Sequence, residues 1–166
     1  MKNSEGFSLV ELIVVISILA ILITTATLGW DSMKRKQAIE DQIRTLFADM
    51  MSVRSEALYT KRDRSVVVTG NSFKVYSSSV IIGTPLSAKS FKYNFTFKPV
   101  GTSLDVTFDT SGLMTGSPGS VCVDPYNDLT EQIDAAVDSI IISQGRINLG
   151  KRDEGGQCDS NGIKQK

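Results

Sequence analysis

Acidic side chains near the C-terminal end of the chain are the residue type that could bind a metal ion. They are Asp124, Asp128, Asp134 and Asp138, followed by Asp153, Glu154 and Asp159 in the stretch RDEGGQCDSNG. Oxygen ligands of this kind suit Ca²⁺. Their spacing fits no EF-hand loop, so we interpret them as solvated loop acids. We expect no metal site and no cofactor.

Basic side chains gather in the same region and could contact phosphate groups. They are Arg146, Lys151, Arg152, Lys164 and Lys166. Nucleic-acid affinity requires cations that acids do not neutralise, because it comes from released counterions. Here acids interleave with the cations, and the whole chain balances 18 basic against 18 acidic residues. We expect a solvated tail. Arg146, Lys151 and Arg152 remain the candidate DNA contacts of an alternative function.

No catalytic constellation is present in the sequence. The chain contains no histidine, which removes the commonest general base and the commonest metal ligand. No glycine-rich phosphate loop and no metal-ligand spacing appears. We therefore expect that the protein is not an enzyme.

The two cysteines, Cys122 and Cys158, have two interpretations. In an oxidising compartment they can form a disulfide. Otherwise they are free thiols that pack as small apolar residues. Export of this part of the chain, which a resemblance described below implies, favours the disulfide.

A single carboxylate, Glu11, interrupts an otherwise uncharged apolar run from Phe7 to Trp30. About twenty apolar residues in helical form cross a bilayer, so residues 7–30 are a candidate transmembrane helix. A charged side chain inside such a helix is costly and should face a partner rather than lipid. The elements around Glu11 must therefore supply that partner.

An ordinary cleaved signal peptide is the main alternative for this run. It would have a basic leader, a shorter apolar core and a small-x-small cleavage site. The leader here holds one lysine, Lys2, and TTATLG is a poor cleavage site. The basic residues 34–36 follow the run, and by the positive-inside rule alone the C-terminal side would stay cytoplasmic. The charge pattern does not settle the topology.

The N-terminus resembles the class III signal of type IV pilins and pseudopilins. The leader MKNSEG ends in Gly6, Phe7 follows, and Glu11 stands at the fifth position after the glycine. The resemblance implies that a prepilin peptidase removes residues 1–6 by cutting between Gly6 and Phe7, and then methylates the Phe7 nitrogen. It also implies a single-pass anchor in inner-membrane lipid with a periplasmic C-terminal domain. Glu11 would pair with the Phe7 amine of a neighbouring subunit during assembly.

Beyond Trp30 the apolar residues form one stripe, at alternating steps of four and three. The stripe consists of Ile39, Ile43, Leu46, Met50, Val53 and Ala57. No proline or glycine interrupts residues 30–62. We therefore expect one helix from Phe7 to about Thr60, with its amphipathic continuation over 31–62 packed against a sheet.

From Ser65 onwards the periodicity changes to two, which predicts short antiparallel strands. Gly70-Asn71 and Gln144-Gly145 mark two hairpins. Further strands are expected at 91–97, 103–109 and 119–124. A turn at Gly112 closes the second of these. Residues 124–138 form an insertion, with a helical turn expected from Leu129 to Val137, and a C-terminal tail ends the chain. The fold class is α+β: a long N-terminal helix packed on a small antiparallel β domain, residues 63–166.

Parts of this domain resemble the GspH/FimT branch of minor pseudopilins and minor pilins. The matching stretches are MMSVRSEALYTKRDRSVVV, VTFDTSGLMTG and IIISQGRINLG. The resemblance implies a structural minor subunit, which we expect in the pseudopilus of type II protein secretion. It would act in the initiation or tip complex with other minor and major subunits. The alternative is a FimT-like minor pilin that binds DNA for natural transformation, although GRIN has Asn148 where that motif has a second arginine.

Overall fold

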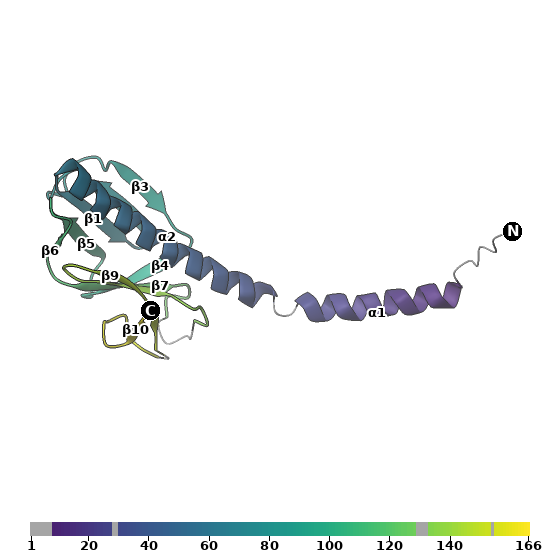
Figure 1. Ribbon diagram of the computed structural model, residues 1–166. Helices are drawn as coiled ribbons and strands as arrows, with labels where there is room; N and C mark the ends of the chain where they lie inside the picture. The colour runs from purple at the N-terminus through teal and green to yellow at the C-terminus, as the bar shows by residue number, and fades with distance from the viewer. Residues whose placement is uncertain (1–7, 28–29, 129–132, 154) are drawn as a thin grey trace. The chain divides into compact units, whose positions relative to one another are not determined.

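The structure is a computed structural model that describes residues 8–27, 30–128, 133–153 and 155–166, with the backbone alone for 25–27. It divides into two compact units, residues 1–35 and 36–166. The first unit contains helix α1 (Leu9–Thr27) and the start of helix α2 (Trp30–Thr60). The second contains the rest of α2 and the strands described below (Figure 1).

Helix α2 lies on the core along one face. Its predicted apolar stripe is confirmed, because all six stripe residues are at most 5% exposed. The helix ends at Thr60, and Lys61 then takes a positive φ of 51°. A left-handed residue at this place is a common helix stop. The predicted buried face and the predicted end near Thr60 are thus confirmed, whereas the predicted continuity of one helix from Phe7 to Thr60 depends on residues 28–29, which lie outside the described residues.

Two five-stranded antiparallel sheets complete the second unit. One has the order β3-β2-β1-β5-β6 and the other β10-β9-β8-β7-β4. The strands of the first sheet are β1 (Arg64–Thr69), β2 (Ser72–Tyr76), β3 (Ser87–Ser90), β5 (Ser103–Phe108) and β6 (Met114–Thr115). Those of the second are β4 (Asn94–Lys98), β7 (Gly119–Asp124), β8 (Ser139–Ile142), β9 (Ile147–Arg152) and β10 (Ile163–Gln165).

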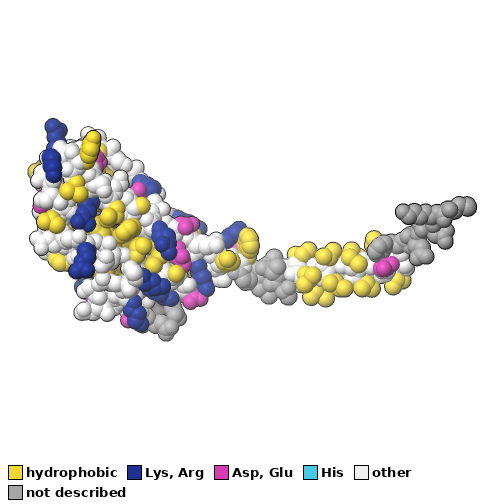
Figure 2. Space-filling view, viewed as in Figure 1, with side chains coloured by type: hydrophobic (Ala, Val, Ile, Leu, Met, Phe, Trp, Pro, Cys, Tyr) yellow, Lys and Arg dark blue, Asp and Glu magenta, His cyan; other side chains and the backbone are white. Residues whose placement is uncertain are grey.

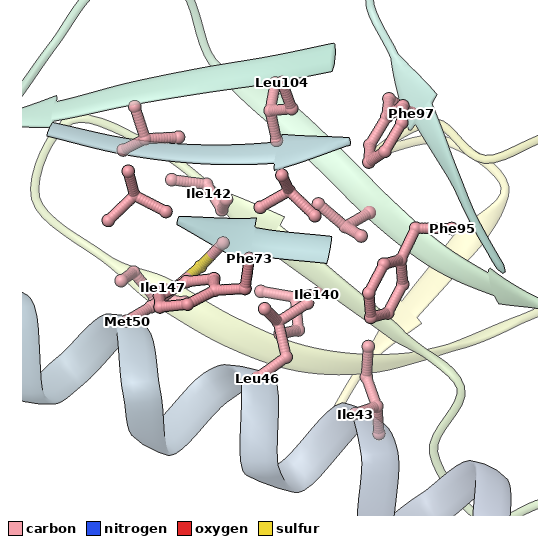
Figure 3. Packing of buried hydrophobic residues seen from close by; sticks show 14 of the residues in the cluster. Ile43, Leu46, Met50, Phe73, Phe95, Phe97, Leu104, Ile140, Ile142 and Ile147 are labelled. Atoms are coloured by element: carbon pink, nitrogen blue, oxygen red, sulfur yellow. The ribbon is translucent and has the colours of Figure 1, made fainter. Parts of the chain in front are cut away.

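The core forms where α2 meets the inner faces of both sheets. Figure 3 shows Ile43, Leu46 and Met50 of α2 directed toward side chains of the strands, among them Phe73 and Ile140. Each fully buried side chain of this kind contributes roughly 1.5–3 kcal/mol of transfer free energy. The long helix and the two sheets therefore stabilise each other through one continuous apolar cluster.

Both predicted hairpins are confirmed. Strands β1 and β2 pair up to Thr69 and Ser72, and Gly70 in the two-residue loop has a φ of +52°. Strands β8 and β9 pair from Ile142 with Ile147. The Ser143 N–H then donates to the Arg146 carbonyl at 2.8 Å, which leaves Gln144 and Gly145 at the tip.

The predicted strand over 91–97 begins later than expected, at Asn94. The side-chain amide of Gln42 on α2 takes up the backbone of Tyr93. It donates to the Tyr93 carbonyl at 2.8 Å and accepts from the Tyr93 N–H at 3.0 Å. The buried Gln42 side chain thus makes the two backbone hydrogen bonds that a neighbouring strand would otherwise make with Tyr93. Strands β3 and β10 were not predicted.

The insertion differs from its prediction where the structure describes it. Residues 133–137 form no helical turn, and residues 129–132 lie outside the described part. Ile133, Ala135 and Val137 are buried, while Asp134 and Ala136 between them are exposed. A period of two indicates an extended segment, so this part of the insertion covers the core as a strand-like strap.

Candidate functional site

Helix α1 presents an apolar surface on all sides. Its large apolar side chains from Leu9 to Ile23 are between 45% and 74% exposed. Figure 2 shows these side chains along the visible face. The Ser17 and Thr24 hydroxyls donate to carbonyls one turn earlier, at 2.8 Å to Ile13 and 3.1 Å to Ala20. The surface of α1 therefore suits lipid or other apolar helices rather than water.

Glu11 is the acidic residue of this helix and lies in its first turn. A carboxylate there is favoured by the partial positive charge of the helix N-terminus. The Glu11 side chain is exposed and forms no hydrogen bond or ion pair with another residue that the structure describes. The predicted processing residues Gly6 and Phe7 lie outside the described residues. Among those that are described, no helix combines the length and apolarity needed to cross a membrane.

The three candidate DNA contacts occupy different environments. Arg146 is exposed at the tip of the β8–β9 hairpin, and Lys151 on β9 is half-buried. Arg152, at the end of β9, has a side chain only 4% exposed. The structure therefore does not bring the three cations together on one open surface.

Arg152 forms a buried ion pair with Asp138. Its Nε lies 3.7 Å from Asp138 Oδ2, and the Asp138 side chain is 2% exposed. The backbone N–H of Arg152 also donates to Asp138 Oδ1 at 2.9 Å. Burial raises the pKa of Asp138, against the lowering effect of that N–H and of the guanidinium charge. The pair lies in the interior of the second unit. Arg152, predicted as a surface cation, is therefore buried.

Three further acids of this region, Asp134, Asp153 and Asp124, also serve local structure. Asp134 pairs with Lys36 of α2, and this hydrogen-bonded cation lowers the Asp134 pKa. Asp153 pairs with Lys164 at 2.6 Å. Asp124 accepts from the Thr96 hydroxyl at 3.1 Å and from the Asp128 N–H at 3.0 Å. Over the described ranges, no group of three acidic or cysteine side chains could hold a metal ion.

The insertion contacts α2 through two adjacent polar groups. Lys36 of α2 forms its ion pair with Asp134, and one turn further along, Glu40 Oε1 accepts the Ala136 N–H at 2.6 Å. Sequence reasoning missed both contacts and the role of Gln42. Gln42 could have been found, because it lies at the spacing of the buried stripe.

A disulfide joins Cys122 on β7 to Cys158 in the C-terminal segment, with a Cα–Cα distance of 5.8 Å. The Ser120 hydroxyl donates to the Cys158 carbonyl at 2.7 Å. A cavity of about 620 Å³ lies beside it, lined in part by Thr96, Asp124 and Gln157. The C-terminal segment is therefore held on the second sheet by the disulfide and by the hydrogen bond from the Ser120 side chain to its backbone.

Comparison with known proteins gives one matching family model and two matching crystal structures of one protein. Residues 1–27 match the family model described as the prokaryotic N-terminal methylation motif. The fold resembles that of the type IV minor pilin FimU of Pseudomonas aeruginosa strain PAO1 in two crystal forms. The first has a TM-score of 0.53 and 17% identity, covering 77% of this chain and 97% of that one. The second has a TM-score of 0.50 and 19% identity, covering 75% and 96%. No curated protein sequence matches this chain.

Proposed function

We propose that the chain is a structural minor subunit of a type IV filament machine, because its first 27 residues match the N-terminal methylation motif and its fold resembles that of a type IV minor pilin. The observation that carries the proposal is the contrast between the two units. The second unit buries its own apolar cluster, whereas α1 exposes apolar side chains all round. Such a helix must be covered by lipid before assembly and by neighbouring helices after it. We assign the protein no catalytic role.

We further propose the processing and location that this class implies. A prepilin peptidase removes residues 1–6 and methylates Phe7. Residues 7–30 then anchor the chain in the inner membrane, and the unit that contains the sheets lies in the periplasm. The disulfide between Cys122 and Cys158 supports an oxidising compartment, where such bonds persist.

Within this class we assign the protein to the type II secretion pseudopilus, where it would join other minor and major subunits in the initiation or tip complex. What supports this choice over DNA binding is the charge arrangement near the C-terminus. Arg152 pairs with Asp138 and Lys164 with Asp153, so these two cations are neutralised locally. Phosphate binding needs cations without such partners.

Deleting the gene tests this assignment. We expect proteins that the type II machine exports to accumulate in the periplasm, while surface pili and DNA uptake persist. The gene that encodes the Glu11→Ala protein should fail to restore secretion, and the wild-type gene should restore it. Normal secretion combined with lost piliation or lost transformation would refute the pseudopilus assignment.

The alternative, a FimT-like DNA receptor, has one observation in its favour: Arg146 is exposed at a hairpin tip. It predicts that the purified protein retards double-stranded DNA at low salt, and that Arg146→Ala removes the retardation. We expect no retardation by either protein.

A further inference from the structure

The start of α2 carries an aromatic side chain and a cation in direct contact. Trp30 is 57% exposed and is the single tryptophan of the chain. The Lys34 ammonium, one turn later, lies 5.3 Å from the centre of the indole ring. Met33 beside them is 54% exposed. Together Trp30, Met33 and Lys34 form a small exposed cluster, which we call the Trp30 cluster.

Lys34 is the cation of this cluster, because the neighbouring cations Arg35 and Lys36 stand near acidic residues. Asp31 and Arg35 stand four residues apart, the spacing at which opposite charges face each other on a helix. Lys36 is held by Asp134. Lys34, by contrast, lies over an aromatic face, and its long stem allows the ammonium to reach outward.

The position of the cluster in the sequence determines which molecules it can contact. It begins with the last residue of the apolar run, Trp30, that we propose as the membrane anchor. An indole prefers the boundary between hydrocarbon and water, because its ring is apolar and its N–H is a donor. A lysine beside it can bind lipid phosphate. The chemistry of the cluster therefore matches a phospholipid headgroup.

We propose that the Trp30 cluster binds a phospholipid headgroup, with the indole at the level of the headgroups and the Lys34 ammonium on the phosphate of an anionic lipid. This inference rests on the membrane anchoring proposed above. It adds a binding site, at the outer end of the anchor, that fixes how deep the helix lies in the bilayer. It also gives the subunit a preference for anionic lipid before it enters a filament.

The single tryptophan makes the site directly measurable. The full-length protein is reconstituted in vesicles of phosphatidylcholine brominated near the top of the acyl chains, and flotation establishes that the protein is membrane-bound. Trp30 emission should be blue-shifted and strongly quenched by these lipids, and less quenched by lipids brominated near the chain ends. Part of the brominated lipid is then replaced with unbrominated phosphatidylglycerol. The loss of Trp30 quenching reports how often phosphatidylglycerol occupies the site.

We expect phosphatidylglycerol to be favoured over phosphatidylcholine at Trp30 about fivefold, the effect of one lysine near an anionic surface. Lys34→Gln should abolish the preference and Lys34→Arg should keep it. Lys92→Gln is the matched control, because the Lys92 ammonium also lies over an aromatic ring, 5.0 Å from the centre of Tyr93. That variant should behave like the wild type.

Other outcomes contradict the inference in distinguishable ways. If the protein floats with the vesicles but Trp30 is quenched only by an aqueous quencher, the cluster faces water or another subunit, while membrane anchoring stands. If the preference for phosphatidylglycerol is absent or survives in Lys34→Gln, Lys34 does not bind lipid phosphate. If the protein does not float, the proposed anchoring fails and the headgroup site with it.

Discussion

At the residue scale, several polar side chains that look available for binding turn out to stabilise the fold. Gln42 holds the backbone of Tyr93, and Arg152 neutralises Asp138 inside the second unit. Burying polar groups is favourable only when they are hydrogen-bonded or paired. The identity of such residues is therefore set by their partners and not by a ligand.

Arg152 gives the first prediction. Arg152→Ala leaves Asp138 as an unpaired buried acid, which should lower the free energy of unfolding by about 3–5 kcal/mol. Arg146→Ala, at an exposed position, should change it by less than about 0.5 kcal/mol. Urea denaturation of both variants measures the difference. A stable Arg152→Ala protein would show that the pair is not part of the folded interior.

Asp109 predicts a pH dependence. Its Oδ1 accepts the N–H groups of Leu113 at 2.9 Å and Ser111 at 2.8 Å. The Leu113 N–H is the main cause that lowers the Asp109 pKa below 3.8. Since the folded pKa is the lower one, this contribution to stability is present above pH 3.8 and is lost as the pH falls through the folded pKa.

The Asp109→Asn protein should therefore be less stable than the wild type at neutral pH and equal to it at strongly acid pH. Unfolding midpoints in urea at the two pH values measure this, with Asp105→Asn as the control for losing an exposed carboxylate. A difference that persists in acid would contradict the charge-based explanation.

Glu11 predicts an assembly defect. Glu11→Ala should still be cleaved and stay in the membrane, because the apolar run is intact. It should enter the filament poorly, because the proposed partner of the Phe7 amine is gone. Immunoblotting of the sheared or cross-linked filament fraction measures incorporation, and Ser17→Ala on the same helix serves as the control. Normal incorporation of Glu11→Ala would refute the pairing.

At the element scale, the turn from Asp109 to Leu113 joins β5 to β6 in the first sheet and contacts the last turns of α2. The Arg54 Nε donates to the Gly112 carbonyl at 2.7 Å, and a Cβ built on Gly112 would lie 2.6 Å from Leu58 Cγ. Gly112 also has a φ of +70°. Both the backbone conformation and the close approach of Leu58 require glycine here.

Gly112→Ala should therefore destabilise the protein by about 2 kcal/mol, from the strained φ and the contact with Leu58. Gly145→Ala is the matched control: nothing lies within 4 Å of its Cβ position, so the effect should stay under about 0.5 kcal/mol. Chemical denaturation compares the two. Adding Leu58→Ala to Gly112→Ala should remove the steric part of the loss, and no coupling between the two sites would contradict this contact.

The elements that the sequence predicts correctly are those with local signals. The α2 stripe follows the helical period, and each hairpin has a glycine in a two-residue loop. Other features depend on distant partners. Strand β3 forms because it pairs with β2, and β10 is three residues long and pairs with β9. The contact between Lys36 and Asp134 joins residues 98 positions apart.

At the scale of the whole molecule, the basic residues after the apolar run are explained by their surroundings. Positive charge there would favour a cytoplasmic location if the cations were free. Lys36 is paired with Asp134 in the second unit, which neutralises one of these cations. This partner weakens the charge signal that opposes a periplasmic location. From residue types alone this could not be predicted, because the partner acid lies in the insertion.

The most direct test of the central claim is the mass of the mature chain purified from membranes. We predict that the protein lacks residues 1–6 and begins with an N-methylated Phe7. That result would place the chain among processed, filament-forming subunits with Glu11 near a free amine. An intact Met1, or a chain cut beyond the apolar run, would contradict the account.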